Sequence, residues 1–440
     1  MQDTPGPKPP LDASLHFGHV FTDHMLQARR TAALPDPGSA APDALRLTRK
    51  SAGADPSRSR PQAEWTRANG WGAPRITPLR PLSLHPAAQA RFAAGEPLLW
   101  ARLRCVAYAD VLLHMRFAPQ TLQYGAHCFE GMKAYAGPDA APRLFRPELN
   151  MERLLSSATR LALPPFSPQH ALRCIAALVR ADASWLPPPT AAGFALYIRP
   201  ALAATTPFLG VGPPLHATFF AVLSPCGPYL AGGGDGAGGV TLFLDEQLVR
   251  AAPGGVGAFK VGGNYAPTIA PVVAAAERYG TAQVLFTAPD AAGGSGAERT
   301  VAEAGAMNVF FLIKTQAGAT ELVTPPLDGT ILPGVTRRSV LELARDGSVP
   351  GYAGTALTVS ERPLRVAELA AAAREGRVLE MFATGTAAVI MPVRALIRHA
   401  GDALRATGPP PGQAPLSAAL AARLADIQCG RTPHPWSVPI

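Results

Sequence analysis

A glycine-rich run near the middle of the chain divides it into two parts of comparable size. The stretch Ala231–Gly239 reads AGGGDGAGG and offers no large apolar side chain to a core. Such a run is typical of a flexible linker. The chain has 440 residues, more than one ordinary domain, and 48% of them are hydrophobic, which is enough for a sizeable core. The sequence therefore predicts two domains joined by this linker.

We place the small N-terminal domain at residues 1–225, the linker at 226–239 and a larger, cofactor-binding C-terminal domain at 240–440. Strand and helix patterns follow one another in both halves, which predicts an α/β (α+β) fold. Residues 31–62 are rich in Pro, Ala and Ser, so we expect a disordered insertion there. Residues 91–115 mix apolar and basic side chains without a period of 2 or 3.6, and this second insertion has no assigned structure.

Local patterns predict the elements on either side of the linker. Strands are expected over residues 129–135 and 143–146, around a turn at 137–139. Asn150 is expected to cap the next helix, and Ser167 the one after it. In the second half, a helix over residues 267–279 is predicted to carry one apolar stripe, made of Ile269, Val272, Val273 and Ala276.

Charge and cysteine content exclude several classes of protein. The net charge is +9, but residues 29–80 account for six of these charges within a Pro/Ala/Ser-rich tract that lacks a basic, aromatic-interleaved face. This pattern does not indicate nucleic-acid binding. The five cysteines form no close pair and no CxxC spacing, which argues against a zinc site or a disulfide framework and suits a reducing compartment. No metal site is expected.

Targeting signals are absent from the sequence as given. No apolar run reaches the length of a membrane helix. The first residues, MQDTPGPKPPLDASLHFG, resemble neither a secretory signal nor an Arg-rich transit peptide. We therefore expect a cytoplasmic protein without a membrane partner, with a mitochondrial location left open if the N-terminus is incomplete.

The strongest chemical signal is a single lysine inside a glycine-rich turn, GGVGAFKVGGNYAPT, which places Lys260 among five glycines. The chain has only five lysines, and arginine supplies nearly all the positive charge. A lysine kept in such a turn suggests an amine that must lose its proton for covalent chemistry. Taken alone, the turn is more often a solvated loop. A nucleotide P-loop is excluded because Gly-Lys-Ser/Thr is missing.

A lysine that forms a Schiff base with an aldehyde cofactor such as pyridoxal phosphate needs three kinds of partner. These are a phosphate site, a donor for the phenolic oxygen and a carboxylate for the ring nitrogen. Backbone N–H groups at a helix start or in a tight turn can hold a phosphate. Candidate groups are present, but spacing alone does not select them from the many similar residues in the sequence.

Several long motifs, in order, do select them. They read FGHVFTDHML, YGAHCFEGMKAY, RLFRPELNMERLLSSATRL, LYIRPAL, GGVGAFKVGGNYAPT, EAGAMNVFF, LVTPPLDGTILPGVTRRSVLELAR and VLEMFATGTAAVIMPV. With these motifs the chain resembles the branched-chain amino acid aminotransferases, which are fold-type IV pyridoxal-phosphate enzymes. The resemblance covers nearly all of residues 17–440 apart from the two insertions.

The resemblance implies roles for particular residues. Lys260 would be the Schiff-base lysine and proton shuttle. The other cofactor contacts would be Tyr265 on the phenolic oxygen, Glu303 on the ring nitrogen, Arg250 beside the cofactor, and Arg153, Val335, Thr336 and Thr386 on the phosphate. The substrate pocket would be lined by Phe17, Tyr124, Phe129, Tyr197 and Tyr229, with Arg199 near its mouth and the Ala387 N–H group on the substrate carboxylate.

The implied reaction transfers the amino group of leucine, isoleucine or valine to 2-oxoglutarate, giving branched 2-oxo acids and glutamate. It also implies a homodimer in which one subunit closes the other's pocket. Alternatives are a D-amino acid aminotransferase, an aminodeoxychorismate lyase, or an impaired paralogue with a binding role. FEGMKAY and GGNYAPT favour the branched-chain activity, but they rank neither the three amino acids nor the biosynthetic and catabolic directions.

Two departures from the family pattern stand out. Ala306 occupies a position where the family usually has threonine, so a hydroxyl group expected near the substrate or ring is missing. Ala388 and Met391 stand where some relatives carry a redox CxxC pair. We therefore predict no thiol switch of that kind.

Overall fold

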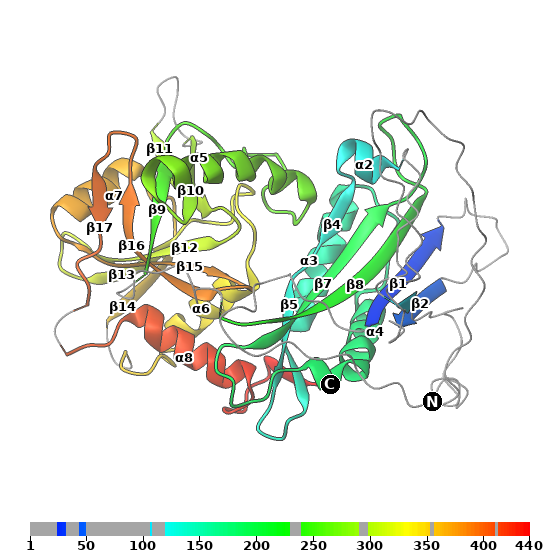
Figure 1. Ribbon diagram of the computed structural model, residues 1–440. Helices are drawn as coiled ribbons and strands as arrows, with labels where there is room; N and C mark the ends of the chain where they lie inside the picture. The colour runs from blue at the N-terminus through cyan, green and yellow to red at the C-terminus, as the bar shows by residue number, and fades with distance from the viewer. Residues whose placement is uncertain are drawn as a thin grey trace.

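The computed structural model describes the backbone of residues 24–31, 44–49 and 106–107, and residues 119–228, 239–289, 298–352, 356–409 and 412–440 with their side chains. Within these ranges two sheets lie side by side, each covered by helices (Figure 1). Phe17, Tyr229 and most of the predicted linker lie outside the described residues. The exact domain boundary therefore stays a prediction, although each predicted half supplies most strands of one sheet.

The N-terminal sheet is antiparallel, in the order β18-β6-β5-β7-β8-β1-β2, with β3 beside β1 and β4 beside β7. Its strands are β1 (His24–Thr31), β2 (Ala44–Arg49), β3 (Val106–Ala107), β4 (His127–Phe129), β5 (Met132–Ala136), β6 (Pro142–Phe145), β7 (Ala195–Ala204), β8 (His216–Cys226) and β18 (Ser437–Pro439). The short helix α2 (Gln120–Tyr124) precedes β4, and a 3-10 turn, η3 (Ala183–Trp185), precedes β7.

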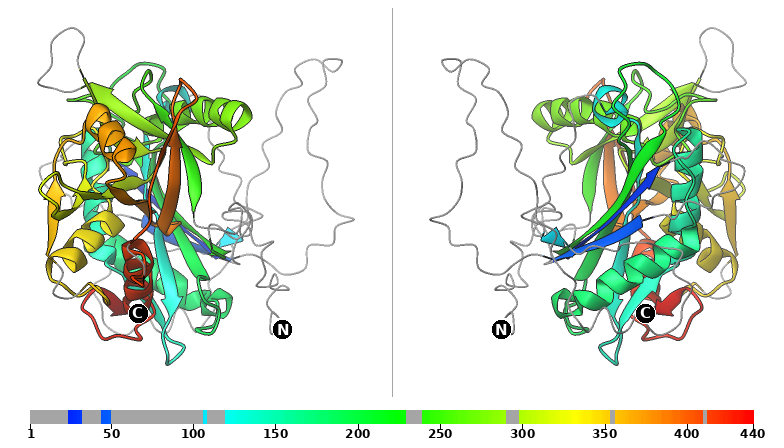
Figure 2. Two further views of the ribbon diagram at one scale, coloured as in Figure 1. Left: turned by 90° about the vertical axis from the view of Figure 1, so that its left-hand side faces the viewer. Right: turned by 90° about the vertical axis from the view of Figure 1, so that its right-hand side faces the viewer.

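Two helices, α3 (Pro147–Arg160) and α4 (Pro168–Ala181), cover one face of this sheet (Figure 2). Ser167 caps α4 by accepting a hydrogen bond from the His170 N–H group, as predicted. The prediction for α3 is wrong, because the helix begins at Pro147. Proline is favoured at the first helical position, where its φ is preset and its missing N–H group costs nothing. Asn150 instead turns its side-chain amide towards Glu130.

The C-terminal sheet is mixed, in the order β11-β10-β9-β16-β15-β12-β13-β14, with β17 beside β16. Its strands are β9 (Val240–Asp245), β10 (Gln283–Pro289), β11 (Arg299–Ala304), β12 (Asn308–Lys314), β13 (Thr320–Thr324), β14 (Leu357–Glu361), β15 (Val378–Gly385), β16 (Val389–Ile397) and β17 (Ala403–Arg405). The helices of this half are α5 (Ile269–Tyr279), α6 (Val335–Arg345), α7 (Val366–Arg374) and α8 (Leu416–Gln428), with 3-10 turns η4 (Gly262–Asn264) and η5 (Ala266–Thr268) before α5.

Both faces of the C-terminal sheet are buried, as β12 shows. Val309, Phe311 and Ile313 pack into one core with α7, whereas Phe310 and Leu312 pack into another with α6 and α8. A strand buried on both faces reads as a continuous apolar run, because successive side chains point to opposite sides. This accounts for the sequence Asn308–Lys314, in which the five residues between the ends are all apolar.

The structure corrects two further predictions. Helix α5 starts at Ile269, but the predicted apolar stripe is not a core face, since Ile269 is 64% and Val273 49% exposed and only Ala275 of this helix is buried. Strand β2 lies inside the segment 31–62 for which disorder is predicted. Its sequence, ALRLTR, alternates leucine with polar residues and contains neither glycine nor proline, which is typical of a strand.

The C-terminal segment returns to the N-terminal sheet. After α8, strand β18 pairs with β6 in register from Ser437 opposite Phe145 to Pro439 opposite Arg143. These last residues, which the predicted boundaries place in the C-terminal domain, therefore pair with the N-terminal sheet. Arg146 adds a second link, because its guanidinium group donates to both carboxylate oxygens of Glu342 on α6. These contacts hold the two sheets in one arrangement, with the site residues lying where the two domains meet.

Candidate active site

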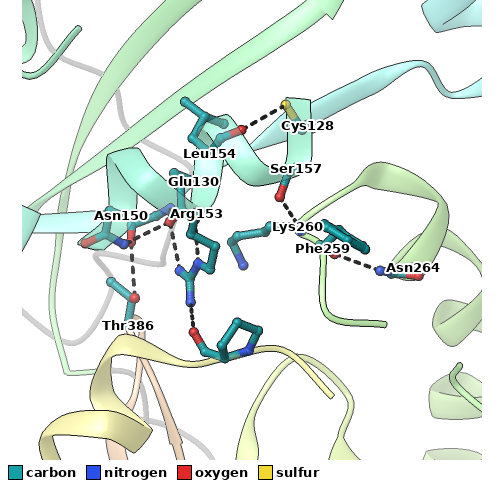
Figure 3. Close-up of polar contacts among 12 residues, drawn as sticks. Cys128, Glu130, Asn150, Arg153, Leu154, Ser157, Phe259, Lys260, Asn264 and Thr386 are labelled. Carbon is teal, nitrogen blue, oxygen red and sulfur yellow. Dashed lines mark hydrogen bonds and ion pairs between the residues drawn. The ribbon is translucent and has the colours of Figure 1, made fainter. Parts of the chain in front are cut away.

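Lys260 lies in the turn between β9 and α5, held by the N-terminal domain. Its N–H group donates to Ser157 Oγ of α3 at 2.8 Å (Figure 3). Its carbonyl oxygen accepts from the Phe129 N–H group at 3.1 Å. A β-carbon on Gly257 would lie 2.4 Å from the carbonyl oxygen of Thr330. Only glycine fits there, so the glycine-rich sequence lets the lysine turn run against a neighbouring loop.

The side chain of Lys260 is enclosed by aromatic rings. Its Nζ atom lies 3.0 Å from the Tyr265 hydroxyl and 4.9 Å from the centre of the Phe129 ring. Burial, together with the nearby Arg153 guanidinium, lowers the pKa of Lys260 to about 8, even though Glu130 acts in the opposite direction. Desolvation disfavours the charged ammonium form. Lys260 is therefore suited to act as a nucleophile or base near neutral pH.

Arg153 and Lys260 point towards one another between the two domains (Figure 3). The Arg153 guanidinium donates to both oxygens of Glu130, at 2.7 and 2.9 Å, and to the Pro333 carbonyl oxygen at 2.8 Å. Glu130 is fully buried and also accepts from the Asn150 amide at 2.9 Å. These contacts fix Arg153 in one orientation next to the segment that leads into α6.

The start of α6 is suited to bind an anion. Val335 and Thr336 are its first two residues, and no side chain caps this helix end. Uncapped N–H groups at a helix start favour a bound anion such as phosphate. A β-carbon on Gly334 would lie 2.1 Å from Asn308 Oδ1, so this close approach needs glycine. Thr386 reaches the same region, and its hydroxyl donates to the Gly131 carbonyl oxygen at 3.2 Å.

Glu303 offers a buried carboxylate whose two oxygens have different partners. Its Oε1 atom accepts from the Asn308 amide at 2.6 Å and from the Leu332 N–H group at 2.9 Å. Its Oε2 atom lies 2.9 Å from Arg250 Nη1 in an ion pair, but accepts no hydrogen bond from any described residue. Burial raises the pKa of Glu303, and Arg250 opposes this. An oxygen that takes part in an ion pair but accepts no hydrogen bond is suited to accept one from a ligand N–H group.

Three of the predicted pocket residues lie together beside Lys260. The Tyr197 hydroxyl accepts from the Arg199 guanidinium at 2.9 and 3.2 Å, and that guanidinium lies 4.9 Å from the centre of the Phe129 ring. Ala387 lies in a half-buried turn across the domain interface, where its carbonyl oxygen accepts from the buried Lys133. These residues combine apolar walls with cationic and amide donors.

Tyr124 lies elsewhere. It is 50% exposed at the end of α2, and its hydroxyl donates to the Leu209 carbonyl oxygen. The structure thus does not bring Tyr124 into the cluster around Lys260 within this chain. Phe17 and Tyr229 lie outside the described residues, so their positions stay predictions.

The sequence interpretation missed residues that hold the site together. Glu130, Ser157 and Asn308 orient Arg153, Lys260 and Glu303, respectively. Glu130 had a usable signal, since it is a charged residue inside an otherwise apolar strand region and is fully buried. Its partner, however, follows 23 residues later on a helix, and local spacing does not reveal such a pair.

No group of three or more His, Cys, Asp or Glu side chains in the described ranges could hold a metal ion. None of the described helices is both long and apolar enough to cross a membrane.

The lowered pKa of Lys260 predicts how its reactivity depends on pH. With a pKa of about 8, about one molecule in ten has a neutral amine at pH 7, against about one in three thousand for an ordinary lysine. The rate at which Lys260 captures an aldehyde probe should rise with pH and level off above about pH 8 to 9. Borohydride trapping and mass spectrometry of the Lys260 peptide measure this rate. A rate still rising steeply at pH 10 contradicts the prediction.

Comparison with known proteins agrees with this arrangement. The family model for amino-transferase class IV matches residues 127–396. The chain is 36% identical over 443 residues to the mitochondrial branched-chain-amino-acid aminotransferase of Bos taurus, covering 100% of this chain and 90% of that protein. It is 35% identical over 431 residues to the cytosolic branched-chain-amino-acid aminotransferase of Rattus norvegicus, covering 98% of this chain and 84% of that protein.

A solved structure is similar as well. The branched-chain aminotransferase of the thermophilic archaeon Thermoproteus uzoniensis, in its crystal structure with norvaline, is 25% identical to this chain, with a TM-score of 0.59. The match covers 76% of this chain and 96% of that one.

Proposed function

Because this chain belongs to the class IV aminotransferases and, among them, to the branched-chain-amino-acid aminotransferases, we propose that it transfers the amino group of L-leucine, L-isoleucine or L-valine to 2-oxoglutarate. The products are the branched 2-oxo acid and L-glutamate. Its cofactor is pyridoxal 5'-phosphate. The observation that carries the proposal is the enclosed amine of Lys260, 3.0 Å from the Tyr265 hydroxyl and facing Arg153 across the domain interface.

The residues present fit this cofactor. Lys260 supplies an amine with a lowered pKa for the aldehyde. The uncapped start of α6 and Arg153 suit the phosphate, and the Oε2 atom of Glu303 suits the protonated ring nitrogen. Tyr265 is hydrogen-bonded to Lys260 and is the natural donor to the phenolic oxygen. Arg250 would lie beside the ring through its ion pair with Glu303.

When bound, the cofactor supplies an electron sink for the bond-breaking at the substrate's α-carbon. The residues of this chain bind the cofactor, orient it and move the proton. Lys260 holds the cofactor and, once displaced by the substrate amine, carries the α-proton on its Nζ atom. Glu303 keeps a proton on the ring nitrogen. Arg153, Val335, Thr336 and Thr386 hold the phosphate, which keeps the ring in place during both half-reactions.

The pocket must accept both an aliphatic side chain and a second carboxylate. Phe129 and Tyr197 provide aromatic walls, and Arg199 provides a cation between them. We assign the substrate's α-carboxylate to the Ala387 N–H group. Phe17 and Tyr229 complete the wall in this proposal.

In our proposal, Tyr124 contributes to the substrate pocket of the partner subunit in a homodimer. Tyr124, Leu209 and Val211 are 50%, 66% and 85% exposed, and Tyr124 contacts the Leu209 carbonyl oxygen, so they form one exposed apolar edge. Exposed apolar side chains that gather in one place are typical of an interface. In the proposed dimer this edge closes the partner's pocket. Sedimentation equilibrium tests it, and a monomer that retains full activity rejects it.

Location is proposed as cytoplasmic. The cysteines that the structure describes, Cys128, Cys174, Cys226 and Cys429, are all free, as expected in a reducing compartment. Imaging of the full-length protein tests this, and a mitochondrial signal rejects it.

The direct test of the activity uses purified protein supplied with pyridoxal phosphate. Incubation with L-leucine and 2-oxoglutarate should give glutamate and 4-methyl-2-oxopentanoate in equal amounts. D-Leucine is the matched control and should give neither. Product from D-leucine alone would favour a D-amino acid aminotransferase, and cofactor binding without product from either enantiomer would favour an impaired paralogue.

Ala306 gives a separate prediction about turnover. It is exposed at the turn between β11 and β12, and its carbonyl oxygen lies 3.9 Å from where a β-carbon on Gly385 would be. The family resemblance implies that a hydroxyl group at this position would lie near the substrate or the ring. We expect Ala306→Thr to raise kcat/KM for leucine about three- to tenfold, because one added hydrogen bond would stabilise the transition state by roughly that factor. Ala306→Val, of the same shape without the hydroxyl, should not. Equal effects of the two variants would contradict the prediction.

A further inference from the structure

Lys133 is a buried cation without a charged partner. It lies on β5, is 5% exposed, and donates from its Nζ atom to the Ala387 carbonyl oxygen at 2.7 Å. Four buried arginines, Arg146, Arg153, Arg250 and Arg337, each form an ion pair with a glutamate. Among the described residues, no carboxylate forms an ion pair with Lys133. The ionisable group beside it is the Cys226 thiol, which is neutral because burial raises its pKa.

Burying an unpaired charge is costly. Burial lowers the pKa of Lys133, which reflects that cost. A buried ammonium group is usually compensated by an anion, and replacing such a group by an apolar one is often neutral or stabilising. Packing alone therefore does not explain why a lysine occupies this position. A negatively charged ligand would explain it, because the ligand would compensate the buried positive charge.

The place of Lys133 indicates which ligand. Its hydrogen-bond acceptor belongs to Ala387, the residue whose N–H group is assigned to the substrate's α-carboxylate. The preceding residue, Thr386, is tied to the Gly131 carbonyl oxygen at 3.2 Å, so two contacts from the Gly131–Lys133 segment hold one turn. Lys133 also lies directly opposite Tyr197 in the β5–β7 register. The ammonium group thus contacts the carbonyl oxygen of the same residue whose N–H group is assigned to the substrate.

We propose that Lys133 is a positioning residue for the substrate's α-carboxylate. Its ammonium group holds the Gly385–Ala387 turn, and the negative charge of the bound carboxylate compensates the positive charge of Lys133. This inference rests on the proposed function, since it assumes that amino acids and 2-oxo acids enter this pocket. The two substrates differ in their side chains but share the α-carboxylate. One buried cation therefore serves both half-reactions.

The test compares two ligands that differ in the carboxylate. 4-Methylpentanoate has the carbon skeleton of leucine and the carboxylate, whereas 3-methylbutan-1-amine has the amine and lacks the carboxylate. Their dissociation constants are measured on the holoenzyme from the change in cofactor absorbance. The variants are Lys133→Met, Lys133→Arg and, as a matched control at an exposed lysine, Lys314→Met.

We expect Lys133→Met to weaken 4-methylpentanoate about thirtyfold and to leave the amine unchanged, because one charge interaction is lost. Lys133→Arg should recover most of the affinity, and Lys314→Met should behave as wild type. KM for leucine and for 2-oxoglutarate should rise in Lys133→Met with a smaller change in kcat. The melting temperature without ligand should not fall, whereas the increase caused by 4-methylpentanoate should shrink.

Two results would overturn the inference. One is an unchanged affinity for 4-methylpentanoate in Lys133→Met. The other is equal weakening of both ligands together with a lower melting temperature, which would make Lys133 a structural residue of the domain interface. If the wild-type protein binds the cofactor and both ligands but does not catalyse transamination, the proposed function is rejected. The comparison of ligand affinities would still test the role of Lys133.

Discussion

Replacing Lys260 with alanine should lower the rate of leucine to 2-oxoglutarate transfer by about a thousandfold or more, since it removes both the nucleophile and the proton carrier. The loss should appear in kcat rather than in the affinity for the cofactor's phosphate. In the proposed site, Arg153 and the start of α6 would hold that phosphate, and neither depends on the lysine side chain. Stopped assays of glutamate formation measure the loss.

Two measurements separate chemistry from folding in this variant. Circular dichroism and thermal melting should match wild type, because the backbone of Lys260 keeps its hydrogen bonds to Ser157 and Phe129. Borohydride treatment should attach the cofactor covalently to wild type and not to the variant. Lys314→Ala is the control at an exposed position and should retain full activity. Full turnover by Lys260→Ala would reject the central assignment.

The glycine-rich turn could be interpreted from sequence because its signal is local. Lys260 and Tyr265 are five residues apart, and their side chains form a hydrogen bond at 3.0 Å. The spacing and the rarity of lysine were sufficient to single out this segment. The close approach of Gly257 to Thr330 explains why the turn has this composition, but it depends on a loop more than seventy residues away, which no local pattern reveals.

Arg153 and Glu303 required the family resemblance. By default a surface role would be assigned to each, since charged residues are mostly exposed. In the structure, each side chain is buried against an opposite charge from a distant segment, Glu130 for Arg153 and Arg250 for Glu303. Long-range pairing of this kind is decided by the packing of two domains, not by periodicity.

For helix α5, by contrast, a clear local signal led to a wrong prediction. Its apolar residues have helical spacing, and the prediction that they face the core is wrong because Ile269 and Val273 lie on the surface. Helical spacing of apolar residues indicates that one face of a helix is apolar, but it does not indicate whether that face packs against a core. Strand β18 escaped prediction for a related reason: its partner, β6, is nearly three hundred residues earlier in the chain.

The second prediction concerns the carboxylate at the other end of the site. Glu303→Gln should lower kcat for leucine about a hundred- to a thousandfold, the loss found when one preorganised electrostatic contact is removed from an active site. An amide keeps the shape and can still accept from Asn308 and Leu332 through its oxygen. It carries no negative charge, so it cannot keep a proton on the ring nitrogen. Affinity for the cofactor should change much less, because the phosphate contacts are untouched.

Glu321→Gln is the matched control, since Glu321 is also buried and forms two hydrogen bonds with an arginine, Arg362, at 2.9 Å each. It removes one buried negative charge far from the cofactor site and should leave kcat near wild type. Glu303→Gln also leaves Arg250 without a counter-charge, so thermal melting must accompany the assay and rates must be taken well below the transition. If both variants lose activity in proportion to their stability, Glu303 serves the fold alone. A wild-type kcat in a folded Glu303→Gln protein would remove Glu303 from the ring nitrogen, while leaving Lys260 and the phosphate site in place.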